Sequence, residues 1–240
     1  MTVPYSNSNK SKKAQIAEMF DNIAHSYDFL NHSLSLGIDK LWRNSLLKMI
    51  KHKKQSAILD IATGTGDMAL AAMKLEPKSV LGIDISAGMI EVGKVKIEKK
   101  GLSHIIKLQK ADSENIPLSD AQFDVITIAF GVRNFENLEK GLKEMLRVLK
   151  SGGVAAILEF SVPRYFPFKQ FYGFYFKTLL PFWGRIISKD KAAYTYLPES
   201  IYAFPYGNRF LEILKNTGFI NTKMKVLSFG IATIYYAEKK

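Results

Sequence analysis

The chain has 240 residues, of which 47% are hydrophobic, so it can bury a large core in one domain with insertions or a small lid. It contains no cysteine, which excludes disulfides, thiolate catalysis and cysteine-ligated zinc. The formal net charge of +12 favours an anionic partner, either a nucleic acid or a membrane surface, although solubility alone would also explain it. The start of the chain has no apolar run and no stretch has the roughly 18 apolar residues of a membrane helix, so we expect a cytoplasmic protein.

Two segments precede the first predicted strand. Residues 1–13 are polar and are predicted to form a disordered tail. Residues 14–50 carry apolar side chains at helical spacing and include a run from Tyr27 to Trp42 that mixes aromatic, acidic and amide groups around Gly37. We expect two helices joined by a loop to cover a ligand-binding turn as a lid, and a simple packing segment is the alternative.

The most informative stretch is residues 58–67, Ile-Leu-Asp-Ile-Ala-Thr-Gly-Thr-Gly-Asp. Its apolar half predicts a buried strand, and Gly64 and Gly66 predict a tight turn where a ligand can contact bare backbone. Good helix formers follow, and a second apolar strand ends at Asp84, 20 residues beyond Gly64. At this spacing a carboxylate binds ribose hydroxyls, so the segment is typical of the nucleotide-binding half of a doubly wound sheet.

Strands and helices continue to alternate along the rest of the chain. We predict helices at 87–100, 137–149 and 205–218 and further strands at 105–111, 123–130, 154–160, 220–228 and 231–237. The pattern predicts an α/β fold with a doubly wound, seven-stranded, mostly parallel sheet that a C-terminal antiparallel hairpin closes. Residues 14–240 are predicted to be a single domain.

The residues that follow four of the predicted parallel strands are expected to gather at one site, because ligands bind outside the carboxyl ends of such strands. They are Thr63, Asp84, Asp112 and Arg133. After the third of these strands, Asp112 and Ser113 could hold the amino edge of an adenine, and an ordinary loop acid is the alternative.

The charge of this site favours one ligand over another. Four carboxylates would lie near it, from Asp60, Asp67, Asp84 and Asp112. An acidic site suits the ammonium and sulfonium groups of S-adenosylmethionine, whereas the pyrophosphate of a dinucleotide prefers a helix N-terminus without competing carboxylates. A dinucleotide oxidoreductase and a purely structural glycine turn remain the alternatives.

An aromatic insertion is predicted at residues 162–204. Eight of the twelve residues from Tyr165 to Phe176 are aromatic, and Pro167 can open a helix. The aromatic residues surround most of this helix and basic residues edge it, which indicates a wall for an apolar substrate or a membrane interface. Core packing alone is the alternative.

With these motifs the chain resembles the class I S-adenosylmethionine-dependent methyltransferases, and within them the quinone C-methyltransferases of menaquinone and ubiquinone biosynthesis. The general motif is Leu59-Asp60-x-x-Thr63-Gly64-x-Gly66-Asp67, and the resemblance runs from about residue 14 to the end. More specific segments extend from Tyr27 through Trp42, from Phe130 to Asn134 and from Arg147 to Ser161.

This sequence departs from the family pattern at several positions. The usual methionine, histidine and proline are replaced by Leu30, Asp39 and Ser151 respectively. The change at Asp39 puts any histidine-based mechanism there in doubt. Ala129 stands where ubiquinone-type enzymes often have serine, which favours the menaquinone branch over the ubiquinone branch.

The resemblance implies methylation of a ring carbon of a demethylmenaquinol, with S-adenosylmethionine as co-substrate and no metal. The predicted donor-binding residues are Asp60, Thr63, Gly64, Gly66, Asp84, Asp112 and Ser113. The ring carbon becomes nucleophilic when its hydroxyl loses a proton, so the site must align the reactants and stabilise a phenolate. We assign this oxygen to Arg133 and Asn134, with a loop salt bridge as the alternative for Arg133.

Three residues are candidate bases for the proton, namely Tyr27, Asp28 and Asp39. The expected partner is the lipophilic quinol, with transient contact at the inner face of the membrane, a homodimer as a further expectation and no nucleic acid. An RNA-binding methyltransferase, which the net charge motivates, is the alternative. A Pro-Pro-Tyr base-stacking motif is missing after the fourth strand, which disfavours methylation of a base amine.

Overall fold

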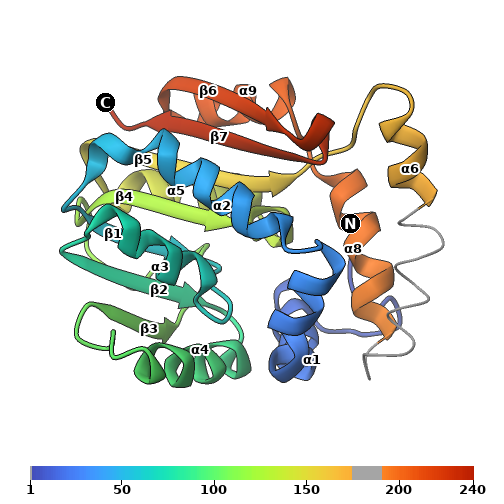
Figure 1. Cartoon of the computed structure of the whole chain (residues 1–240), viewed down its shortest axis with the longest axis horizontal. Coiled ribbons are helices and arrows are strands. Elements are labelled where there is room, and N and C mark those ends of the chain that lie inside the picture. The colour runs from blue at the N-terminus through green and yellow to red at the C-terminus, as the bar shows by residue number, and fades with distance from the viewer. Residues whose placement is uncertain (1, 175–190) are drawn as a thin grey trace.

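A seven-stranded sheet forms the centre of the computed structural model, which describes residues 2–174 and 191–240 (Figure 1). The strands are β1 (Ala57–Ile61), β2 (Ser79–Asp84), β3 (Ile106–Lys110), β4 (Phe123–Ala129), β5 (Leu149–Phe160), β6 (Ile220–Leu227) and β7 (Ala232–Glu238). They lie in the order β3-β2-β1-β4-β5-β7-β6. The first five are parallel, whereas β7 is antiparallel to its neighbours β5 and β6. The predicted sheet and its C-terminal hairpin are confirmed.

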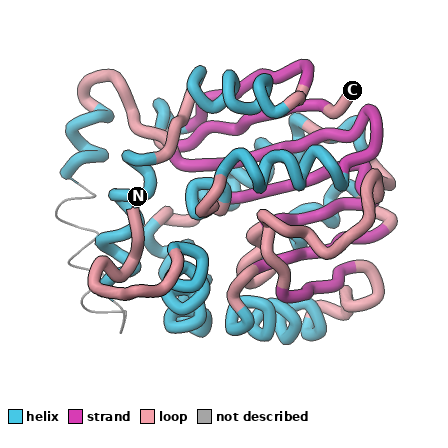
Figure 2. Tube along the Cα trace, turned by 180° about the vertical axis from the view of Figure 1, so that it is seen from behind, coloured by secondary structure: helices cyan, strands magenta, loops and turns pink. Residues whose placement is uncertain are grey.

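Both faces of the sheet are covered, because its central strands are apolar on both sides. In β1, Ile58 belongs to one buried cluster, and Leu59 and Ile61 belong to a second cluster on the opposite face. The first cluster includes residues of α2 (Ile38–Met49), α3 (Asp67–Ala72) and α4 (Ala87–Lys99). The second includes residues of α5 (Leu138–Val148) and α9 (Asn208–Thr217), which cover the face seen in Figure 2.

Three helices stand together beyond the carboxyl ends of the parallel strands (Figure 1). They are α1 (Lys12–Leu34), α6 (Phe168–Phe174) and α8 (Lys191–Ala203). They share a third apolar cluster, to which α1 contributes Ile16 and Met19, α6 contributes Tyr172 and α8 contributes Tyr196. The two helices predicted for residues 14–50 are α1 and α2, which meet at Gly37.

Several boundaries differ from the predicted ones. The helix α1 begins at Lys12, because Ser11 caps it by accepting a hydrogen bond from the Ala14 N–H at 3.3 Å. The last two residues of the predicted tail 1–13 are therefore helical. Strand β5 begins at Leu149 instead of 154, because Leu149 already pairs with Phe123 of β4.

The predicted aromatic insertion is described in part. Pro167 directly precedes α6, as expected of a residue that can open a helix. The remaining aromatic and basic residues of the insertion at 175–190 lie outside the described residues. Within the described ranges, no helix is both long enough and apolar enough to cross a membrane.

Candidate active site

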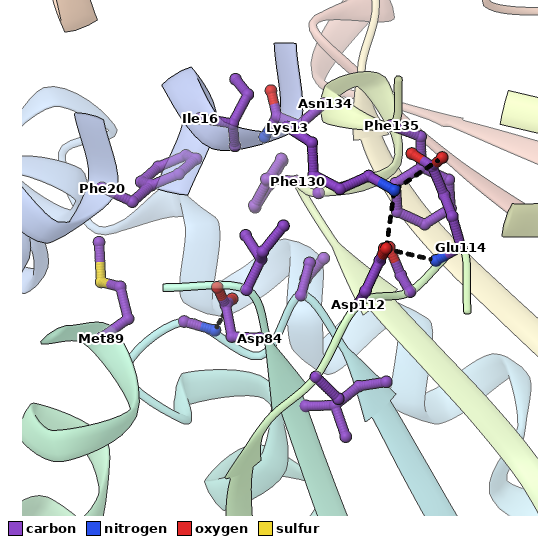
Figure 3. Close-up of a pocket in the computed structure, with 18 of the residues that line it drawn as sticks. Lys13, Ile16, Phe20, Asp84, Met89, Asp112, Glu114, Phe130, Asn134 and Phe135 are labelled. Carbon is purple, nitrogen blue, oxygen red and sulfur yellow. Dashed lines mark hydrogen bonds and ion pairs between the residues drawn. The ribbon is translucent and has the colours of Figure 1, made fainter. Parts of the chain in front are cut away.

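The glycine turn after β1 is shaped by two glycines and one carboxylate. Gly64 and Gly66 have φ angles of +56° and +85°, which side chains disfavour. Asp84, at the end of β2, lies in the pocket wall (Figure 3) and accepts hydrogen bonds from the N–H groups of Gly64 at 2.8 Å and Ser86 at 2.9 Å. Burial raises the pKa of Asp84, and this carboxylate forms no ion pair with any described residue. Asp84 therefore keeps acceptor capacity for a ligand.

Asp60 supports the same turn from inside the sheet. It is fully buried and accepts hydrogen bonds from the hydroxyls of Thr63 at 2.5 Å and Thr127 at 2.7 Å. Burial raises the pKa of Asp60 to about 6. Gly64 lines the neighbouring pocket, whereas Asp60, Thr63 and Gly66 do not, and the donor-binding role of these three residues stays a prediction.

The pocket lies at the carboxyl ends of the strands, where the sequence predicted it. The predicted donor residues in its wall are Gly64, Asp84, Asp112 and Ser113. The loop after β4 contributes Asn134, and α1 forms the facing wall with Lys13, Ile16 and Phe20 (Figure 3). Tyr27 of α1 also lines the pocket. The structure thus brings most of the predicted donor residues and two of the predicted acceptor residues to one pocket.

Lys13 is a pocket residue that sequence reasoning missed. Its Nζ lies 2.7 Å from Asp112 Oδ2 and 3.2 Å from Glu114 Oε2 (Figure 3). The adjacent Lys12 donates from Nζ to the carbonyl of Phe135 at 2.8 Å. The first turn of α1 is therefore anchored to the loops after β3 and β4. The sequence does not distinguish Lys13 from the many other lysines along the chain, so it could not be predicted as a pocket residue.

The lid helix α1 is also joined to the other side of the pocket. Asp21 accepts hydrogen bonds from Ser86 Oγ at 2.5 Å and from the Gly88 N–H at 2.8 Å. Ser86 is the N-cap of α4, where its Oγ accepts from the Met89 N–H at 3.1 Å, and its own N–H binds Asp84. One serine therefore connects the lid, α4 and the carboxylate at the end of β2.

Arg133 and Asn134 follow β4, but their side chains contact different groups. The Arg133 guanidinium lies 2.7 Å from Glu159 in an ion pair whose side chains are 7% and 0% exposed. Its Nη1 also donates to the carbonyl of Phe130. Asn134 lines the pocket and Arg133 does not. The salt bridge weighed as the alternative is present, and the role of Arg133 in binding oxygen stays a prediction.

The two aspartates considered as bases are held by cations. Asp28 lies 2.6 Å from Lys96 Nζ, and Asp39 is fully buried and paired with Arg43. Although burial opposes the ionisation of Asp39, hydrogen bonding from Ser35 and the charge of Arg43 lower its pKa. Neither carboxylate lines the pocket, and their assignment as candidate bases stays a prediction.

Tyr27 is the candidate base that does line the pocket. Burial raises its pKa to about 12, so at neutral pH its hydroxyl carries a proton. A protonated phenol donates a hydrogen bond and is a poor proton acceptor. This favours Tyr27 as a donor to a ligand oxygen.

One cluster near the glycine turn has metal-ligand character. His32, Asp39 and Asp67 place ligand atoms within 4.8 Å of one another. The guanidinium of Arg43 pairs with Asp39 and lies 3.8 Å from Asp67, and the two ring nitrogens of His32 lie 3.0 and 3.3 Å from the same carboxylates. The positive charge that these carboxylates need is therefore already present in the side chain of Arg43.

The architecture belongs to a known class of enzyme folds. A crystal structure of an S-adenosylmethionine-dependent methyltransferase from Aquifex aeolicus matches it with a TM-score of 0.59, over 81% of this chain and 88% of that one. The two sequences are 22% identical, so the match defines the fold. The chain has the fold of the S-adenosylmethionine-dependent methyltransferases.

The chain belongs to the ubiE/COQ5 methyltransferase family, whose model matches residues 8–239. It is 48% identical to the demethylmenaquinone methyltransferase of Bacteroides fragilis, over 98% of this chain and 96% of the relative. It is 49% identical to the ubiquinone/menaquinone biosynthesis C-methyltransferase UbiE of Geotalea daltonii, over 95% and 97% of the two chains. The resemblance found in the sequence motifs is confirmed.

Proposed function

We propose that this chain transfers the methyl group of S-adenosylmethionine to a ring carbon of a demethylmenaquinol. The observation that carries the proposal is one pocket with two unlike walls. Asp84 and Asp112 lie on the side of the sheet, and Phe20 and Tyr27 lie on the side of α1. Because the apolar cluster of α1, α6 and α8 adjoins this pocket, an acidic wall for a cationic donor stands beside apolar surface for a lipophilic ring.

The acidic wall fits the donor. Two backbone N–H groups fix the carboxylate of Asp84, which leaves its free lone pairs for ribose hydroxyls. Asp112 and Ser113 would hold the amino edge of the adenine, and Gly64 lets the donor approach the backbone. When bound, the donor supplies a methyl group activated by its sulfonium.

The task of the chain's own acceptor residues is to orient the quinol and to stabilise its ring oxygen as the proton leaves. Asn134 lines the pocket and can donate from its amide nitrogen. Tyr27, with its pKa of about 12, supplies a second proton donor. Arg133 adds positive charge that Glu159 partly neutralises. Together these groups lower the pKa of the ring hydroxyl, which makes the neighbouring carbon nucleophilic.

A direct assay tests the reaction. The purified protein is mixed with S-adenosylmethionine and a short-chain demethylnaphthoquinol kept reduced, and the product is analysed by mass spectrometry. We expect a product heavier by one methyl group on the ring carbon, and calorimetric binding of S-adenosylmethionine but not of NAD. In cells that lack the chain, the quinone pool should be lighter by one methyl. Binding of NAD without methyl transfer would overturn the proposal.

We also propose that an anionic membrane surface delivers the quinol. Three segments, 36–41, 164–169 and 225–229, carry large apolar side chains that are 63–85% exposed, namely Leu36, Leu41, Tyr165, Phe166 and Phe229. The segments adjoin, because Trp42 donates to Ser228 Oγ at 2.8 Å and the rings of Phe168 and Phe229 stack at 3.8 Å. We call these segments the exposed apolar surface.

The charge of the exposed apolar surface suits anionic headgroups. Its exposed ionisable residues are all basic, namely Lys40, Arg164, Lys169 and Lys225, and its single acid, Asp39, is fully buried. None of the four basic residues forms an ion pair with another described residue. Basic side chains around exposed aromatic residues are typical of a surface that lies against a bilayer.

Vesicle flotation tests this contact. The protein should float with phosphatidylglycerol vesicles and not with phosphatidylcholine vesicles, and Leu41→Asp with Phe166→Asp should abolish flotation. Val95→Asp, a change at a 50% exposed residue of α4, is the matched control and should leave flotation intact. Flotation of the double variant would contradict the proposal. Gel filtration of the same variants measures whether this surface instead forms the predicted homodimer.

A further inference from the structure

One turn of α8 carries two hydroxyl groups that hold Asn134 and Arg133. Tyr196 Oη donates to Asn134 Oδ1 at 3.2 Å, and Arg133 Nε donates to Ser200 Oγ at 3.3 Å. Tyr196 and Ser200 are each 3% exposed. Residues four apart lie on the same side of a helix, so a single face of α8 contacts two consecutive residues of the loop after β4.

The contact with Tyr196 sets which end of the Asn134 amide faces a ligand. Because Oδ1 accepts from the phenol, Nδ2 is the end that remains to donate, and it has no hydrogen-bond partner in the described part of the chain. A donor stabilises a phenolate oxygen, whereas an amide oxygen would repel it. Without Tyr196, the amide of Asn134 is free to turn its oxygen toward the pocket.

The contact with Ser200 limits the guanidinium of Arg133 in the same way. The Ser200 hydroxyl donates to the carbonyl of Leu197 at 2.8 Å, which turns its lone pairs toward Arg133 Nε. Nη1 is bound by Glu159 and by the carbonyl of Phe130. Nη2 has no hydrogen-bond partner among the described residues, and it is not among the fully buried unpaired atoms. Ser200, Glu159 and Phe130 thus fix the guanidinium of Arg133, which does not itself line the pocket.

We propose that Tyr196 and Ser200 are positioning residues: Tyr196 fixes the donor group of Asn134 for the ring oxygen, and Ser200 fixes the positive charge of the adjacent Arg133. The inference rests on the methyl transfer proposed above. Burial raises the pKa of Tyr196 to about 12, so its hydroxyl keeps its proton at neutral pH and remains a hydrogen-bond donor. The aromatic insertion thus has a second role, because α8 sets the polarity of the acceptor site and does more than supply apolar surface.

The variant Tyr196→Phe tests this role, because it keeps the ring and removes only Oη. We expect kcat with the short-chain quinol to fall about five- to tenfold, which is the effect expected from the loss of one hydrogen bond. The KM for S-adenosylmethionine should be unchanged. The pH at which kcat is half-maximal should rise, because the phenolate loses stabilisation. The double variant with Asn134→Ala should lose no more activity than Asn134→Ala alone, since Tyr196 acts through Asn134.

Two further variants keep the test decisive. Ser200→Ala should lower kcat severalfold, and Ser200→Thr, which restores a hydroxyl, should recover it. Tyr202→Phe is the matched control, because Tyr202 lies on the same helix but is 55% exposed, and its kcat should equal that of the unmodified protein. If Tyr196→Phe fails to fold, as a melting curve would show, the two serine variants decide the question.

Three results would overturn the inference: additive losses in the double variant, an unmoved pH profile, or equal losses in Tyr202→Phe. Any of these in a protein that still methylates the quinol refutes the positioning role alone. An unmodified protein that transfers no methyl group refutes the proposed function, and the positioning role with it.

Discussion

The two walls of the pocket are built in different ways. We call the side with Asp84 and Asp112 the donor wall and the side with Tyr27 and Asn134 the acceptor wall. The donor wall depends on backbone groups close in sequence, the N–H groups of Gly64 and Ser86, which fix Asp84. The acceptor wall is assembled from α1 and the loop after β4, and the hydrogen bond by which Tyr196 of α8 holds Asn134 spans 62 residues. Backbone N–H groups persist when most side chains are substituted, whereas a contact between distant side chains depends on both of them.

The largest effect should come from the acceptor wall, at the ion pair of Arg133 and Glu159. Arg133→Met leaves a fully buried carboxylate without its cation, so the free energy of unfolding should fall by about 3–5 kcal/mol, measured by urea unfolding. Turnover should be lost. The affinity for S-adenosylmethionine should stay nearly intact, because Arg133 does not line the pocket that holds the donor residues.

A second substitution separates the structural and chemical parts of this effect. Glu159→Gln in the Arg133→Met background removes the unpaired charge, so much of the stability should return. Turnover should remain absent. Recovery of turnover in the double variant would show that Arg133 serves the fold only, and loss of donor binding in Arg133→Met would show that the two walls are not independent.

Asp60, beneath the donor wall, should make the free energy of unfolding depend on pH by up to about 3 kcal/mol. The pKa of Asp60 is about 6 in the folded protein and has an ordinary value of 3.8 in the unfolded chain. Between pH 3.8 and 6 the folded protein therefore binds more protons than the unfolded chain, and the free energy of unfolding falls as the pH rises through this range. Asp60→Asn lacks this dependence. The free energy of unfolding of the variant minus that of the unmodified protein, measured by urea titration, should therefore rise from pH 3.8 to pH 6. A difference that is constant with pH would contradict the raised pKa.

A smaller effect is expected where the donor wall meets its ligand. Asp84→Asn removes a charged acceptor, so calorimetry should show S-adenosylmethionine binding about 10- to 100-fold more weakly. The KM for the quinol should be unchanged. The matched control is Glu91→Gln, at an exposed acid of α4, and it should bind the donor normally. Equal weakening in both variants would indicate a general charge effect.

The smallest effect should come from the contact that joins the two walls. Lys13 pairs with Asp112 and Glu114, and both Lys13 and Asp112 are partly exposed, so the pair is weak. Lys13→Met frees the carboxylate for the adenine and should tighten donor binding by no more than about fivefold. The gain should shrink at high salt. Weaker binding in the variant would show that Lys13 contacts the donor directly.

The donor wall was predictable because its geometry is local. The spacing from Gly64 to Asp84 and the apolar strands around it determine where the turn and the carboxylate meet. The sequence predicts Asp60 and Thr63 as donor residues, but only the structure shows that their side chains bond to each other and lie outside the pocket wall. Sequence pattern gives the residue types at strand ends and does not say which side chains reach the ligand.

For the acceptor wall, the sequence indicates candidate residues but not their contacts. Arg133, Asn134 and Tyr27 were identified from motifs, whereas the partners Glu159, Ser200 and Tyr196 were not. These partners come from other elements, so no spacing in the chain reports them. The ion pair of Asp39 with Arg43 is different, because both residues lie one turn apart in α2 and their i, i+4 spacing is present in the sequence.

The serine at the start of α4 predicts an order of substrate binding. Ser86 binds Asp84 through its backbone and Asp21 through its hydroxyl, so it connects the strand end proposed to bind the ribose with the helix α1, which is proposed to cover the ring. Occupying the first should organise the second, and the two substrates should then add in a compulsory sequence, S-adenosylmethionine before the quinol. The measurement is product inhibition in the steady state. S-Adenosylhomocysteine should inhibit competitively against S-adenosylmethionine and not competitively against the quinol.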